Sequence, residues 1–176
     1  MDSKSKRGGE IMNQPQPIRI SDIAILQTVL VTLLNTFPDL PSQIKKDGIF
    51  IENLSPQKVS MCLTTLPTGN VKLNSYICGK YRGRYNFGII LQKMTTSTAK
   101  KISASDVLGK IGAWLEKKPI EKSDGTVYQL TSYPYLDENR EIERIEQTSF
   151  SRLIERLDPN IEIWEMTAYL DFIVKP

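Results

Sequence analysis

Residues 59–94, VSMCLTTLPTGNVKLNSYICGKYRGRYNFGIILQKM, decide the fold. The stretch divides into three strand-like runs, Val59–Leu66, Val71–Cys78 and Tyr85–Met94, separated by turn-forming residues. In the third run the large apolar residues take alternate positions: Tyr85, Phe87, Ile89 and Leu91. A period of two is typical of a strand with one buried face. We therefore expect a three-stranded meander here.

Two amphipathic helices flank this meander in the sequence. The first is expected to begin at Ser21, a good N-cap with Asp22 beside it, and to end before Pro38. Its apolar stripe has helical spacing: Ile23, Leu26, Leu30, Leu33 and Phe37. The second is expected to begin at Ser103 or Ser105 and to end before Pro119. Its inward residues are Val107, Leu108, Ile111, Trp114 and Leu115.

The C-terminal third of the sequence predicts further strands. Runs at Thr126–Tyr133 and Glu141–Thr148 have strand character, Ser151–Leu157 is ambiguous, and Ile161–Val174 alternates cleanly. At about 3.3 Å per residue the last run is roughly 45 Å long, so one end is expected to protrude towards a partner. We predict that its apolar face packs against both helices, with this core: Trp164, Met166, Leu170 and Phe172 against Leu26, Leu30, Leu33, Leu108 and Trp114.

Together these elements predict one α+β domain, residues 18–176, with a largely antiparallel mixed sheet and two main helices on one face. The polar residues 1–17 are interpreted as a flexible N-terminal arm, because they lack the apolar stretch of a signal peptide. No apolar run reaches the roughly 20 residues of a membrane span, so no membrane partner is expected. The loop Thr95–Lys101 is expected on the surface.

The composition argues against an enzyme. The 176 residues contain no histidine, the commonest general base and metal ligand. The Walker and dinucleotide-binding spacings are also missing, so we expect no cofactor, no metal and no catalytic residue. The two cysteines, Cys62 and Cys78, fall in strand-like runs and are interpreted as buried free thiols. The net charge of +3 is too small to indicate a nucleic-acid-binding protein.

The one basic-aromatic cluster consists of Lys80, Arg82 and Arg84, interleaved with Tyr81 and Tyr85. Such a cluster can contact phosphates and stack on bases. It can equally be a solvated hairpin tip whose charges protect a sheet edge. The second interpretation is favoured, because no wider basic field surrounds the cluster. We treat the three cations as candidate interface or channel contacts on an exposed, mobile tip that contributes little to folding.

The order of several short segments resembles a known family. The segments are LTTLP (63–67), YICG (76–79), GRYNFGI (83–89), IGAWL (111–115), IEQTS (145–149) and WEMTA (164–168). From about residue 20 onwards the chain resembles the tail terminator proteins of long-tailed bacteriophages, often labelled minor capsid proteins in phages and prophages of Gram-positive hosts. The resemblance rests on order and pattern rather than on one motif.

The resemblance implies a structural protein of the virion head–tail junction, assembled in the host cytoplasm. Such a protein forms a ring, commonly a hexamer, that caps the tail tube and stops its growth. Its implied partners are further copies of itself, the tail tube protein and the head-completion protein, with transient non-specific contact to phage DNA. The alternatives are a head-completion or stopper protein of the virion and, from a different class, a nucleic-acid-binding accessory domain.

Overall fold

Among the described residues, six of the eight strands belong to one sheet, and the other two form a small separate sheet. The computed structural model describes residues 16–56, 59–94, 103–122, 124–158 and 160–175, so most of the expected arm and the loop Thr95–Lys101 lie outside the described residues. The elements, in chain order, are α1 (Ile20–Asn35), α2 (Ser42–Asp47), β1 (Phe50–Ile51), β2 (Ser60–Thr65), β3 (Val71–Ser75), β4 (Tyr81–Met94), α3 (Ala104–Leu115), β5 (Ile120–Glu121), β6 (Val127–Tyr128), β7 (Arg140–Asp158) and β8 (Ile161–Val174).

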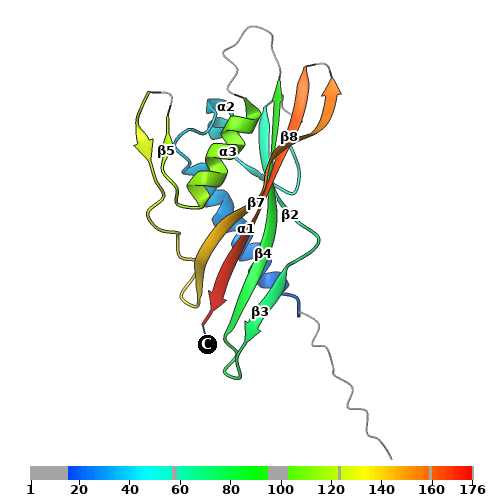
Figure 1. Ribbon diagram of the computed structural model, residues 1–176. Coiled ribbons are helices and arrows are strands. Elements are labelled where there is room, and N and C mark those ends of the chain that lie inside the picture. Colours follow the sequence, from blue (N-terminus) through cyan, green and yellow to red (C-terminus); the bar gives the residue numbers. More distant parts are fainter. Residues whose placement is uncertain (1–15, 57–58, 95–102, 123, 159, 176) are drawn as a thin grey trace, which may run out of the picture.

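The sheet is mixed but mainly antiparallel. Its strand order is β1-β2-β4-β8-β7, with β3 pairing to the start of β4, and only β1 and β2 run parallel. The helices lie against one side of this sheet (Figure 1). The predicted fold class, one α+β domain with a largely antiparallel sheet, is therefore confirmed. The helices leave the opposite face of the sheet open.

The predicted meander differs in detail. β3 pairs with the first part of β4, and β2 pairs with its second part. β4 begins at Tyr81 instead of Tyr85. β3 ends at Ser75, because the chain turns at Tyr76–Lys80, where the Tyr76 N–H donates to the Lys80 carbonyl at 2.9 Å. Gly79 has a φ of +82° in this turn, a conformation that favours glycine. Arg82 and Arg84 consequently lie inside a strand.

The core forms where the predicted apolar faces meet. β4 and β8 pair over 14 residues, which places Leu170 opposite Tyr85 and Met166 opposite Ile89 on one face. α1 and α3 cover this face with Leu26, Leu30 and Leu108, all completely buried. The predicted core is confirmed, except that Trp164 is only partly buried at its edge.

The helix starts follow the prediction at α3 and not at α1. Ser103 is the N-cap of α3, as one of the two predicted positions. At α1 the N-cap is Arg19, and Ser21 lies within the helix. Asp22, expected beside the N-cap, lies in the first turn and is completely buried, with its carboxylate bound to the Arg140 guanidinium and the Tyr81 hydroxyl. Tertiary pairing therefore sets the start of α1.

The largest difference from prediction concerns β7. It continues beyond Thr148 through the ambiguous stretch, so that its 19 residues face the 14 residues of β8 across five register shifts. Such shifts are β-bulges or related irregularities, and β-bulges twist and bend an edge strand. The strand predicted at Thr126–Tyr133 is reduced to β6, which pairs only with β5 in a separate two-stranded sheet.

The two cysteines differ in environment. Cys62 is buried in β2, where burial and then the nearby Glu52 carboxylate raise the pKa of its thiol to about 11. Cys78 lies in the Tyr76–Lys80 turn and is exposed, so the prediction of a second buried thiol is wrong.

Thiol labelling of the native protein at neutral pH is expected to modify Cys78 rapidly and Cys62 only after unfolding. The thiolate is the reactive form, and a buried thiol with a raised pKa supplies little of it. Mass spectrometry of a timed reaction with a disulfide reagent measures both rates. Equal rates at Cys62 and Cys78 would contradict the described packing of β2.

Candidate assembly surfaces

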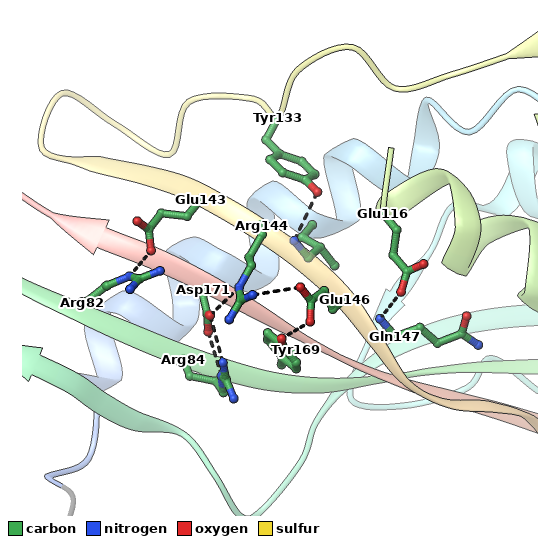
Figure 2. Close-up of polar contacts among 11 residues, drawn as sticks. Arg82, Arg84, Glu116, Tyr133, Glu143, Arg144, Glu146, Gln147, Tyr169 and Asp171 are labelled. Carbon is green, nitrogen blue, oxygen red and sulfur yellow. Dashed lines mark hydrogen bonds and ion pairs between the residues drawn. The ribbon is translucent and has the colours of Figure 1, made fainter. Parts of the chain in front are cut away.

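The open face of the sheet carries a network of paired charges. Arg84 donates from Nε to Asp171 Oδ1 at 2.7 Å and from Nη2 to Oδ2 at 2.9 Å. Arg144 donates from Nε to Asp171 Oδ2 at 2.9 Å. These side chains come from the adjacent strands β4, β7 and β8, and Figure 2 shows them converging on the carboxylate. The network ties together the three strands at the centre and edge of the sheet.

Tyr169 completes this network. Its ring lies 3.8 Å from the Arg84 guanidinium carbon and 5.4 Å from that of Arg144, both cation–π distances. Its hydroxyl donates to Glu146, which also accepts from Arg144 Nη1 at 2.9 Å. Arg84 and Arg144 are thus engaged by protein groups, so this network is not arranged as an anion site.

The pKa of Asp171 reflects its partners. Burial alone would raise the pKa of this carboxyl, but hydrogen bonds from Arg84 and then Arg144, with their charges, outweigh burial and hold the pKa below its ordinary value. A carboxyl with a lowered pKa binds fewer protons in the folded state than in the unfolded state. Its stabilisation is therefore present above the unfolded pKa, about 4, and is lost as pH falls through the folded pKa.

The wild-type protein is accordingly expected to lose part of its stability advantage over Asp171→Asn as pH falls from 5 to about 2. Above pH 5 the difference between the two proteins should be constant, because Asp171 is then ionised in both the folded and the unfolded wild-type protein. Chemical unfolding at a series of pH values measures this difference. A difference that is independent of pH down to 2 would show that the fold does not lower the pKa of Asp171.

The candidate contacts occupy two different settings. Lys80 lies at the end of the turn, with its ammonium 5.9 Å from the centre of the Tyr76 ring. Arg82 pairs with Glu143 on β7, and Arg84 with Asp171. Lys80 and Arg82 share a small pocket of about 180 Å³, also lined by Tyr76, Tyr81, Glu143 and Ile173. The expectation of three exposed cations on a hairpin tip is wrong for Arg82 and Arg84, because β4 begins before them.

Replacing Arg84 by Ser is expected to destabilise the fold by about 1.5 to 3 kcal/mol, because the buried Asp171 loses two charge-assisted hydrogen bonds. Replacing Lys80 by Ser should change stability by less than about 0.5 kcal/mol, since surface substitutions away from such networks have small effects. Urea unfolding of the two single variants makes the comparison. If the two substitutions changed stability equally little, Arg84 would have no more structural role than an exposed cation on a hairpin tip.

The edge strand β7 is capped by side chains along its first half. The Ile145 N–H donates to the Tyr133 hydroxyl at 3.2 Å, and the Gln147 N–H donates to Glu116 Oε1 at 2.9 Å. Tyr133 in turn donates to the Leu115 carbonyl at 2.7 Å, at the end of α3. These groups border an open cleft of about 400 Å³. An unpaired strand edge invites pairing with another chain, and capping blocks this here.

The second half of β7 presents a different surface. Phe150 is 90% exposed, and Leu157, Ile154 and Leu153 are exposed to lesser extents, near the end of the β7–β8 hairpin. We call Phe150, Ile154 and Leu157 the hairpin apolar set. The sequence analysis missed it, because it left Ser151–Leu157 unassigned. The sequence analysis expected one end of the last strand to protrude but did not say which end.

Among the residues that the structure describes, every buried side-chain nitrogen and oxygen has a hydrogen-bond partner, and no group of three or more acidic or cysteine side chains could hold a metal ion. In the same residues, no helix has the length and apolar character needed to cross a membrane. The polar groups of the open face join its strands through their ion pairs, and the exposed apolar side chains are candidate contact surfaces.

Comparison with known proteins gave no assignment: no family model matches the chain, and neither does any curated protein.

Proposed function

We propose that this protein is a non-enzymatic tail terminator of a long-tailed bacteriophage or prophage, acting as a ring of identical subunits. The observation that carries the proposal is the β7–β8 hairpin, which exposes Phe150, Ile154 and Leu157 while its neighbouring charges are paired internally. Large apolar side chains that are exposed to solvent are candidates for contact sites. The order of segments that resembles the tail terminator family supplies the identity of the assembly.

The ring architecture suits the proposed task on physical grounds. A closed ring stops the growth of a tube and leaves an axial passage open for DNA. Each subunit contact can be weak, because several identical contacts act together once the tube provides a template. The proposed partners are copies of the same chain, commonly six, the tail tube protein and the head-completion protein. The proposed location is the head–tail junction of the virion, reached from the host cytoplasm.

The paired charges weigh against the nucleic-acid-binding alternative. Two of the three candidate cations, Arg82 and Arg84, are neutralised by Glu143 and Asp171. A nucleic-acid-binding surface needs cations available to replace counterions at phosphates. Contact with DNA in the proposed ring is therefore transient and non-specific, as for any channel wall.

Disruption of the gene tests the proposal, with lysates examined by negative-stain electron microscopy. The expected result is full heads and free tails that do not join, with tails of irregular or excessive length, and rescue by the gene supplied in trans. Normal virions would contradict the proposal. Tails of normal length attached to heads that leak DNA would instead favour the head-completion protein.

A further inference from the structure

The hairpin apolar set lies in the part of β7 where the pairing with β8 is irregular. Register shifts occur between Ser149 and Arg152, between Leu153 and Glu155, and between Arg156 and Asp158. Each apolar residue of the set falls inside one of these shifts, where β7 has an additional residue. Bulged edges pair poorly with an added strand, because their N–H and C=O groups lose regular spacing. A partner at this surface is therefore held by side chains and not by strand addition.

Charge around the set favours a partner of ordinary protein character. Arg152 pairs with Glu165 at 2.9 Å and Arg156 with Glu162 at 3.1 Å, both across the hairpin. These pairs neutralise the two arginines beside the apolar side chains, and the remaining charge between them is the exposed, acidic Glu155. A polyanion or an anionic membrane would need unpaired cations here. A copy of this chain, with a net charge of only +3, can approach such a surface without strong repulsion.

Two further exposed apolar side chains lie in and after β6. Val127 in β6 is 62% exposed, and Tyr135, eight residues further along the chain, is 84% exposed. Figure 1 shows the β5–β6 hairpin and the β7–β8 hairpin on opposite sides of the helical layer. β5 and β6 form a separate sheet of only two residue pairs, Ile120 with Tyr128 and Glu121 with Val127. A sheet this small is marginal alone, so a partner packed on it adds stability.

Two different apolar surfaces on opposite sides are what a closed ring of identical subunits requires, because each contact joins unlike faces. We propose that Phe150, Ile154 and Leu157 of one subunit pack on the Val127–Tyr135 segment of the next subunit. This contact rests on the proposed ring function and assigns its subunit interface. A pairing of β7 with β7 would be symmetric, would close as a dimer and could not continue a ring.

Photocrosslinking tests the assignment directly. Benzoylphenylalanine is placed at Phe150, and the labelled protein is mixed with an equal amount of isotopically heavy wild-type protein before irradiation. The expected products join the probe to residues 126–136 of a heavy chain, as read by mass spectrometry. Products at another segment of the heavy chain, products within one chain only, or a monomer without products at about 1 mM protein would overturn the assignment.

A set of variants measures the same contact without a probe. Phe150→Ser, Leu157→Ser and Tyr135→Ser are each expected to weaken self-association roughly tenfold or more in sedimentation experiments, because central aromatic and aliphatic anchors dominate interfaces. Ile77→Ser is the matched control, because Ile77 is fully exposed in the β3–β4 turn and outside both surfaces. Circular dichroism and thermal unfolding verify that each variant folds. Equal association of all four variants and the wild-type protein would overturn the assignment.

The failure of this assignment can be separated from failure of the proposed function. Suppose that gene disruption leaves heads and tails unjoined but the crosslinks fall outside residues 126–136. The proposed terminator function would then stand, and this interface would be rejected. Normal virions after gene disruption would reject the terminator itself, even where the crosslinks fall in the expected segment.

Discussion

Replacing Leu170 by Ala is expected to lower the free energy of unfolding by about 2 to 5 kcal/mol. Leu170 is completely buried in β8, between Tyr85 of β4 and Ile145 of β7 in the same sheet. Truncation removes apolar contacts and leaves a cavity that the neighbouring strands cannot close, because both are held by long ladders of hydrogen bonds. This position joins the sheet to the helical layer, so the loss is large.

Urea unfolding followed by tryptophan fluorescence measures this loss, with Leu73→Ala as the control. Leu73 is an exposed leucine of β3, so its truncation should change stability by less than about 0.5 kcal/mol. A loss below half a kcal/mol at Leu170, with the fold retained, would count against the described core.

Replacing Asp22 by Ala is expected to destabilise the fold by about 3 to 5 kcal/mol. The completely buried carboxylate accepts hydrogen bonds from Arg140 Nε at 2.8 Å and from the Tyr81 hydroxyl, so it connects α1, β7 and β4. Removal of this carboxylate leaves the Arg140 guanidinium with Asp137 as its remaining partner, and it leaves the buried Tyr81 hydroxyl without an acceptor. The penalty arises from these poorly compensated groups more than from the lost attraction.

Asp106→Ala provides the matched control, because Asp106 also lies in the first turn of a helix but is exposed. Its loss should cost only the interaction with the helix dipole, about 0.3 to 1 kcal/mol. Thermal and urea unfolding of both variants give the comparison. Similar small losses at the two positions would mean that Asp22 acts only at the helix end, as its place in the sequence indicates.

The regular parts of the fold were predictable because one periodicity dominated each of them. Strict alternation over Ile161–Val174 gave the bounds of β8, and the helical stripe around Leu26 and Leu30 gave the buried face of α1. In both cases the apolar residues that recur along the element are those that face the core. Composition and order then sufficed for the fold class.

The second half of β7 could not be predicted, since its apolar residues do not alternate. Phe150, Leu153, Ile154 and Leu157 recur at the spacing of a helix, yet they belong to a strand. The long pairing with β8 and its bulges impose the extended conformation. Tertiary pairing thus overrides local pattern, and the same override creates the apolar surface assigned above to the subunit contact.

For the candidate contacts, the sequence predicted a cluster of cations but not the environment of each cation. Lys80, Arg82 and Arg84 are close in sequence, but whether they are exposed depends on where β4 begins. The partners Glu143 and Asp171 lie 61 and 87 residues away from Arg82 and Arg84, respectively. No local pattern reports such distant pairing, so a stabilising charge network resembled an exposed basic tip.

Cryo-electron microscopy of the head–tail junction, in virions of the phage or prophage that carries this gene, tests the central claim most directly. The account predicts a closed ring of copies of this chain at the head-proximal end of the tail tube, into which the described α+β fold fits as one subunit. Absence of the chain from purified virions, or density for it along the whole tube or within the head shell, would contradict the account.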